Sequence, residues 1–247
     1  MTDQQLLQLR RLFEVMEQLR APQGCPWDRA QTHQSLLPFL LEETYETIQA
    51  AEAGRSEELA EELGDLLVEV AMHSAIAAEA GTFDIGQVAK IATEKMIGRH
   101  PHVFGELEAA DLGQVISNWE ELKRREKPDR ESALDGIPNS LPALALAAAI
   151  QRRQPAISDG SGPDPALSAQ QTLEQLAGGT ASGASADELI GELLYAVVAV
   201  ARARDLDAEG ALRRFAARRR QSLRQTELAD RDQTVVAGSQ VAPDGAK

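Results

Sequence analysis

The sequence predicts an all-α protein. Its composition is 43% hydrophobic but only 4% aromatic, and a chain rich in Ala, Leu, Glu and Arg suits helix–helix packing. Apolar residues recur at three- and four-residue intervals along most of the chain, which is typical of amphipathic helices. No segment alternates apolar and polar residues convincingly enough to predict a strand. With 247 residues, the chain is long enough for one large domain or two small ones.

The first helix is expected from about Asp3 to Leu19. Its apolar stripe, spaced at three and four residues, consists of Leu6, Leu9, Phe13 and Met16. The following residues, 21–26, contain two prolines and a glycine. These residues favour a turn and end the helix.

Capping residues mark the next two helices. Thr32 or Ser35 is expected to begin the second helix, and Gly54 to end it. Ser56 is the expected cap of the third helix, whose first turn carries two glutamates that favour the positive end of the helix dipole. This third helix is expected to continue until Gly81.

The remaining chain divides into further helices and a linker. Residues 155–165 are rich in Pro, Gly, Ser and Asp, which predicts a linker. We therefore expect an N-terminal domain over 1–154, a second domain over 166–230 and a disordered tail over 231–247. The later helices are expected at about 85–99, 111–127, 141–154, 166–176, 187–204 and 208–228.

An internal repeat relates the two domains. Residues 41–46 match 169–174, and residues 62–67 match 189–194. Three of the five carboxylates in the first copy are replaced in the second, two by Gln and one by Leu. Gln is a far weaker cation ligand than a carboxylate. The second domain is therefore expected to keep its fold without binding a metal.

Two acidic clusters are the most informative feature of the first domain. Glu42, Glu43 and Glu46 lie on the second expected helix, and Glu62 and Asp65 lie on the third. Their spacing aligns carboxylates along one side of a helix, where like charges repel by a few tenths of a kcal/mol per pair. A hard divalent cation such as Mg²⁺ would reverse that repulsion. Spacing alone leaves open a metal site or ordinary solvated charges.

The positions of the apolar residues favour a shared seam. We expect Leu41, Tyr45 and Ile48 to form the apolar stripe of the second helix, and Leu63, Leu66 and Val70 that of the third. Packed antiparallel, the two helices would bring their acidic rows to one seam.

Other metal sites fit poorly. A carboxylate-bridged di-iron bundle needs Glu-x-x-His pairs, whereas Glu69 and His73 are four residues apart. Cys25 is the only cysteine, which argues against a cysteine-based zinc site.

Charge and hydropathy limit the classes of partner and the cellular location that we expect. The net charge is −14 and the pI about 4.8. This balance argues against nucleic acid, because phosphate backbones need a basic surface. No apolar run approaches the length of a membrane span, and the polar N-terminus does not resemble a signal peptide. A soluble cytoplasmic protein is therefore expected.

Several motifs occur in an order that resembles the MazG family of all-α nucleoside triphosphate pyrophosphohydrolases. The resemblance covers residues 5–155 and, in a less complete form, 166–228. Beside the two acidic clusters, its motifs lie at 24–28 (GCPWD), 31–36 (QTHQSL), 99–105 (RHPHVFG), 119–123 (WEELK) and 132–138 (SALDGIP).

This resemblance implies a reaction and its ligands. The reaction would be the Mg²⁺-dependent hydrolysis of a nucleoside triphosphate to the monophosphate and pyrophosphate, with Mn²⁺ as an alternative cation. Glu43, Glu46, Glu62 and Asp65 match the metal ligands, and Glu42 completes the motif. Either Glu42 or Glu46 would orient or deprotonate the attacking water.

The resemblance also implies substrate-binding residues and a dimer. Lys95 and Arg99 match phosphate-contacting positions, and Trp119 and Lys123 would meet a base and a phosphate. The same residues would also fit solvated charges and a core tryptophan. Dimerisation would complete four-helix-bundle-type assemblies. A narrower enzyme for dUTP, dCTP or a damaged nucleotide, and a non-catalytic acidic scaffold, are the alternatives.

Overall fold

The computed structural model of the chain is helical wherever it assigns regular secondary structure. It describes residues 1–105, 111, 113–115, 118–119, 122, 131–153, 164–178 and 183–239, and gives the backbone alone for 184 and 229–239. No strand occurs in these residues, which confirms the all-α prediction. The chain divides into two compact units, Met1–Pro128 and Asp129–Lys247.

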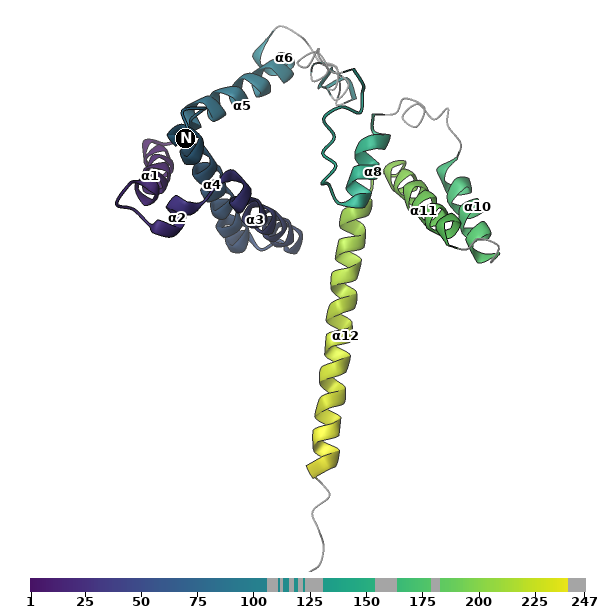
Figure 1. The fold of residues 1–247 in the computed structure, drawn as a ribbon. Helices are drawn as coiled ribbons and strands as arrows, with labels where there is room; N and C mark the ends of the chain where they lie inside the picture. The colour runs from purple at the N-terminus through teal and green to yellow at the C-terminus, as the bar shows by residue number, and fades with distance from the viewer. Residues whose placement is uncertain are drawn as a thin grey trace, which may run out of the picture. The chain divides into compact units, whose positions relative to one another are not determined.

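Short connections join the helices of the first unit (Figure 1). The helix expected over 111–127 lies largely outside the described residues. The described helices are α1 (Asp3–Arg20), α2 (Pro26–Ala30), α3 (His33–Ala53), α4 (Ser56–Glu79), α5 (Ile85–Arg99) and α6 (Pro101–Phe104).

Helices α3 and α4 form an antiparallel hairpin because their ends are well specified. Thr32 caps α3 through a reciprocal capping box with Ser35, so both candidate capping residues take part. Gly54 ends α3 in the left-handed conformation, with φ of 67°, which a glycine adopts without strain. Ser56 is the first residue of α4 rather than its cap, because Arg55 occupies the cap position without a side-chain hydrogen bond.

Helix α1 packs on α4 and closes the core of the first unit. The buried residues of this core are Met16, Leu36, Ala71 and Met72. Leu36 is only 2% exposed, and burying a leucine side chain stabilises a fold by about 1.5–3 kcal/mol. Of the expected apolar stripe of α1, Met16 is buried, whereas Leu6 at the start of the helix is 49% exposed.

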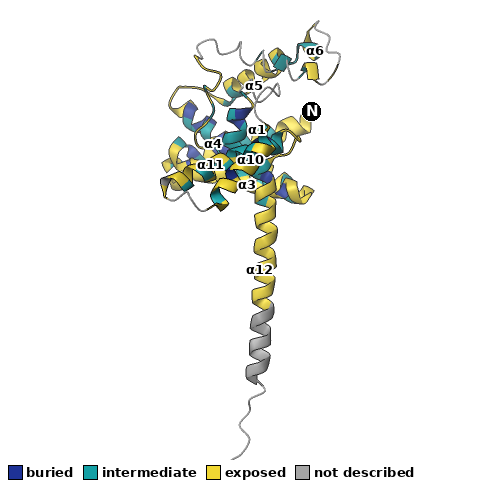
Figure 2. Ribbon diagram, turned by 90° about the vertical axis from the view of Figure 1, so that its right-hand side faces the viewer, coloured by how far each residue is buried: buried dark blue, intermediate teal, exposed yellow. Residues whose placement is uncertain are grey.

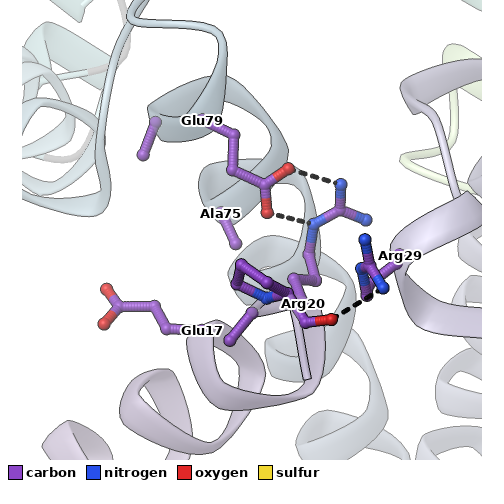
Figure 3. A pocket seen from close by; sticks show the side chains of 8 residues that line it. Glu17, Arg20, Arg29, Ala75 and Glu79 are labelled. Atoms are coloured by element: carbon purple, nitrogen blue, oxygen red, sulfur yellow. Dashed lines mark hydrogen bonds and ion pairs between the residues drawn. The ribbon is translucent and has the colours of Figure 1, made fainter. Parts of the chain in front are cut away.

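An ion pair joins the C-terminal ends of α1 and α4. Arg20 contacts Glu79 through two nitrogen–oxygen pairs, Nε–Oε1 and Nη2–Oε2, both 2.8 Å long. Figure 3 shows this pair in a pocket beside Arg29, which donates to the carbonyl oxygen of Pro22 at 2.9 Å. The hydrogen bond from Arg20 lowers the pKa of Glu79, with the nearby arginine charges adding to it and partial burial opposing it. This contact fixes the end of α1 against the helix that carries Glu62 and Asp65.

The second unit contains a second helical hairpin. Its described helices are α8 (Ala143–Gln151), α10 (Pro165–Ala177), α11 (Ala184–Arg202) and α12 (Ala208–Ser239). Helices α10 and α11 pack together, and α8 packs on α11 and α12. Gln151 is fully buried and donates to the Tyr195 carbonyl oxygen at 2.8 Å. Helix α8 therefore belongs to the second unit, whereas the expected N-terminal domain, 1–154, included it.

Helix α12 is longer than expected. It continues to Ser239, whereas the expected helix ends at about 228 and the expected tail begins at 231. Figure 2 shows that most residues of α12 whose burial is described are exposed. None of the helices in the described ranges combines the length and apolarity that a membrane crossing requires.

Candidate metal centre

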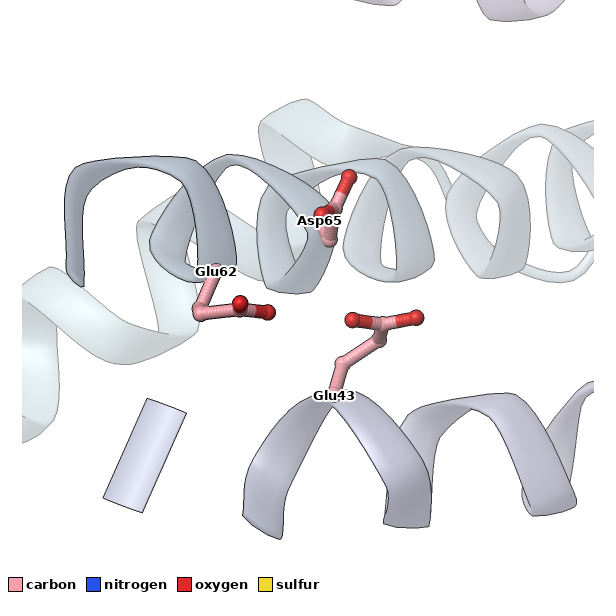
Figure 4. A group of neighbouring side chains, drawn as sticks. All are labelled: Glu43, Glu62 and Asp65. Carbon is pink, nitrogen blue, oxygen red and sulfur yellow. The ribbon is translucent and has the colours of Figure 1, made fainter. Parts of the chain in front are cut away.

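Three carboxylates from the α3–α4 hairpin converge on one point. Glu43 of α3 faces Glu62 and Asp65 of α4 (Figure 4). Each side chain offers an oxygen, and the three oxygens lie within 4.8 Å of one another. Glu43 and Glu62 are half-buried, and Asp65 is exposed. The antiparallel hairpin thus brings together three of the four predicted metal ligands.

Glu42 and Glu46 lie at the margin of this cluster. Both side chains are exposed on α3, and neither belongs to the group of three. The charge of Glu46 nevertheless raises the pKa values of Glu43 and Glu62, so it acts on the cluster. Glu42 directly precedes Glu43 in the sequence, and its charge also raises the pKa of Glu43.

Burial and mutual repulsion both raise the pKa values of two carboxyl groups in the cluster. The pKa of Glu62 is raised, first by partial burial and then by the charges of Glu46, Glu43 and Asp65. Partial burial is also the largest cause of the raised pKa of Glu43, and the carboxylates that add to it are, in order, Asp65, Glu46, Glu42 and Glu69. Protons are thus held more tightly than at an isolated carboxyl group.

The cluster has the chemistry of a hard-cation site. Among the described residues, no Lys or Arg forms an ion pair with any of the three carboxylates. All three donors are carboxylate oxygens, which Mg²⁺ and Ca²⁺ prefer. A bound divalent cation would convert the repulsion between the carboxylates into attraction. The residues therefore fit such a cation.

The expected apolar stripes are only partly buried. Leu41 is 58% exposed and Leu63 47% exposed, whereas Ile48 and Leu66 are half-buried. The core between α3 and α4 also contains Leu36. Three of the predicted acidic residues meet between the two helices, whereas Leu41 and Leu63 do not line the apolar side.

The predicted substrate-binding residues are partly brought together. The guanidinium carbon of Arg99 lies 5.5 Å from the ring centroid of Trp119, a cation–π distance. His100 meets the edge of the same ring, with centroids 4.8 Å apart. Lys95 is exposed on α5, and Lys123 lies outside the described residues. The expected pairing of Trp119 with Lys123 is therefore untested.

Sequence reasoning missed a histidine pair in the same hairpin. The Nδ1 atoms of His33 on α3 and His73 on α4 lie 2.7 Å apart, and the rings are stacked. Nothing in the spacing of two histidines forty residues apart predicts their contact. The antiparallel pairing of the two helices, once assumed, would have placed them opposite each other.

The second unit does not reproduce the cluster. At the positions that match Glu42 and Glu46, the Gln170 amide donates to Glu174 at 2.9 Å. In the described part of the chain, three converging ligands occur only in the group on α3 and α4. That the second unit binds no metal stays a prediction.

Comparisons with known proteins place this hairpin in a family. The family model described as the MazG nucleotide pyrophosphohydrolase domain matches residues 31–104, which include the cluster. The chain is 39% identical over 206 residues to the nucleoside triphosphate pyrophosphohydrolase/pyrophosphatase MazG of Thermotoga maritima, covering 82% of this chain and 79% of that protein. It is 36% identical over 216 residues to the nucleoside triphosphate pyrophosphohydrolase of Escherichia coli K12, covering 84% and 82%.

A third relative matches a shorter part of the chain. The protein YabN of Bacillus subtilis is 45% identical over 139 residues, which is 56% of this chain but 28% of that protein.

Proposed function

Because the chain belongs to the MazG nucleotide pyrophosphohydrolase family, we propose that its first unit hydrolyses nucleoside triphosphates to the monophosphate and pyrophosphate with Mg²⁺. The observation that carries this proposal is the convergence of Glu43, Glu62 and Asp65 in a part of the chain matched by the family model. The enzyme is thus a nucleoside triphosphate pyrophosphohydrolase, and we expect broad rather than narrow base specificity.

The carboxylates would hold the cation against the polyphosphate of the substrate. When bound, a divalent cation neutralises phosphate charge and lowers the pKa of water. Glu43, Glu62 and Asp65 are its proposed ligands, and Mn²⁺ would fit the same oxygens. Glu46 is the proposed fourth ligand, because it is close enough to act on the charges of Glu43 and Glu62.

A general base for the attacking water comes from the same helix. Glu42 and Glu46 are exposed at the margin of the cluster, where a carboxylate can accept a proton from water and release it to solvent. Hydrolysis of the bond between the α and β phosphates would then need little from the protein beyond positioning and charge neutralisation.

Substrate binding would involve the basic and aromatic residues after α4. Arg99 and Trp119 contact each other, so a base could stack on the indole while the guanidinium remains near a phosphate. Lys95 and Lys123 are proposed to contribute further positive charge. Since nucleoside triphosphates are cytoplasmic metabolites, the proposed location is the cytoplasm.

A homodimer would bury apolar residues that the first unit leaves exposed. Leu41, Tyr45, Leu63 and Val70 on α3 and α4 are 38–58% exposed. Pairing two such hairpins into a four-helix bundle would remove these side chains from water, a favourable change of about 25 cal/mol per Å² of apolar surface. The proposed partners are therefore the nucleotide and a second copy, without nucleic acid.

The proposed reaction is tested by identifying the products. The full chain is incubated with Mg²⁺ and each of a panel of NTPs and dNTPs that includes dUTP and dCTP, and pyrophosphate and orthophosphate are measured separately. We expect pyrophosphate equal in amount to the monophosphate, and no turnover after chelation of the cation. Orthophosphate as the first product would show that a different bond is cleaved, and turnover of dUTP or dCTP alone would show a narrower enzyme.

A further inference from the structure

One acidic residue of α4 has no role in the site described above. Glu69 lies four residues after Asp65 and seven after Glu62, so the three side chains share a face of the helix. Unlike its two neighbours, Glu69 is buried, with 7% of its surface exposed. The acidic row thus continues from the open cluster into the interior of the hairpin.

The buried carboxylate has an unpaired oxygen. Oε2 of Glu69 is inaccessible to solvent and has no hydrogen-bond partner. Among the described residues, no Lys, Arg or His forms an ion pair with it. A surface glutamate at the edge of an apolar face would extend its carboxylate into water, and a buried unpaired charge is strongly unfavourable. Packing alone therefore gives no reason for a glutamate here.

The position of this side chain connects it with the cluster. Glu69 lies one helical turn after Asp65, on the face of α4 from which Glu62 and Asp65 meet Glu43 of α3. On the other side of Glu69, one helical turn along α4, lies His73, whose Nδ1 contacts His33 rather than the carboxylate. The residue with the unpaired oxygen thus adjoins the cluster on the same helix face.

We propose that Glu69 is an additional residue of the cation site, which it closes from the buried side of the hairpin. This inference rests on the proposed function, because it assigns a residue to the same site. The ligand class is a hard divalent cation, whose charge would offset the cost of burying the Glu69 carboxylate. Glu69 acts either as a direct ligand or through one water, as outer-shell carboxylates do in other metal sites.

The experiment compares cation affinity with stability in the full chain. Mn²⁺ alone is titrated calorimetrically into the wild type and into Glu69→Gln and Glu69→Met, which keep the side-chain size without the charge. Glu57→Gln, in the exposed first turn of the same helix, is the matched control. We expect about 10- to 100-fold weaker Mn²⁺ binding for both Glu69 variants and wild-type affinity for the control.

Thermal denaturation of the cation-free proteins supplies a second readout. Both Glu69 variants are expected to melt at or above the wild-type temperature, because each removes an unpaired buried carboxylate. A glutamate that served only packing would give lower melting temperatures without a change in affinity. Gln is polar and Met is apolar, so one of the two variants can fold even if the other does not. A single folded variant is sufficient to compare the Mn²⁺ affinity with that of the wild type.

The outcomes separate this inference from the proposed function. Wild-type affinity in a folded Glu69 variant would overturn the role of Glu69 while leaving the site of Glu43, Glu62 and Asp65 intact. Absence of Mn²⁺ binding in the wild type itself would overturn both.

Discussion

At the scale of single residues, the stacked His33 and His73 control how the hairpin responds to acid. Their Nδ1 atoms are 2.7 Å apart, so one ring must donate to the other and both cannot be protonated there. Burial lowers the pKa of His73, and the charge of His33 lowers it further. Nε2 of His73 is buried without a partner, so protonation gains no compensating hydrogen bond.

We predict that this pair makes the fold less stable as the pH falls. Because the pKa of His73 is lower in the folded than in the unfolded chain, its contribution is present above the ordinary value of 6.5 and is lost as the pH falls below it. His73→Gln should make the free energy of unfolding less dependent on pH between 7.5 and 5.5, by at most about 1.4 kcal/mol per pH unit. Urea denaturation measures this slope, and an unchanged slope would contradict the assignment.

At this scale, the sequence predicted some residues of the site and could not predict others. The i, i+3 spacing of Glu62 and Asp65 places them on one helix face regardless of tertiary structure, so they could be named beforehand. The burial of Glu69 could not, because it depends on which neighbouring side chains cover it. Likewise, Leu41 belongs to a regular apolar stripe on α3 and Leu63 to one on α4. Such a stripe does not show whether it packs against the neighbouring helix or against a second molecule.

At the scale of elements, the geometry of the cluster depends on where α3 ends and α4 begins. Gly54 is in the left-handed region at φ of 67°, and its amide donates to the carbonyl oxygens of Ala50 and Ala51. This turn sets the register in which Glu43 faces Glu62 and Asp65.

Replacing this glycine should therefore destabilise the hairpin. Gly54→Ala has room for its Cβ, since no atom lies within 4 Å, but the left-handed conformation costs about 1–2 kcal/mol for an L-residue. Gly64→Ala, inside α4 and equally unobstructed, is the matched control and should stabilise the fold by about 0.5–1 kcal/mol. Chemical denaturation gives both values, and equal effects of the two substitutions would show that the turn conformation is not the cause.

Elements with strong end signals were predicted well, and those without were not. Asp84 caps α5 through a capping box with Gln87, and the helix runs from Ile85 to Arg99 as predicted. Helix α12 continues past the expected end near 228 to Ser239, although residues 229–239 include Asp, Thr, Val and Gly, which have low helix propensity. A periodicity argument cannot detect such an extension.

At the scale of the whole molecule, one chain carries two copies of a helical hairpin with different chemistry. The α3–α4 copy retains carboxylates at all five motif positions, whereas the α10–α11 copy keeps only Glu174 and Glu192. The structure divides the chain near residue 128, before the mostly apolar helix α8. Such a helix can pack on either neighbour, so its sequence does not show which unit it joins.

The most direct measurement of the central claim compares matched carboxylates in the two copies. Asp65→Asn and Glu192→Gln each remove one charge at equivalent positions of the repeat, and pyrophosphate release from a nucleoside triphosphate is measured for both full-length variants with Mg²⁺. Asp65→Asn should reduce kcat/KM at least about 100-fold, the scale of losing one electrostatic group from a site, while Glu192→Gln should retain wild-type activity. Loss of activity in Glu192→Gln with Asp65→Asn fully active would place the reaction in the second unit and contradict the account.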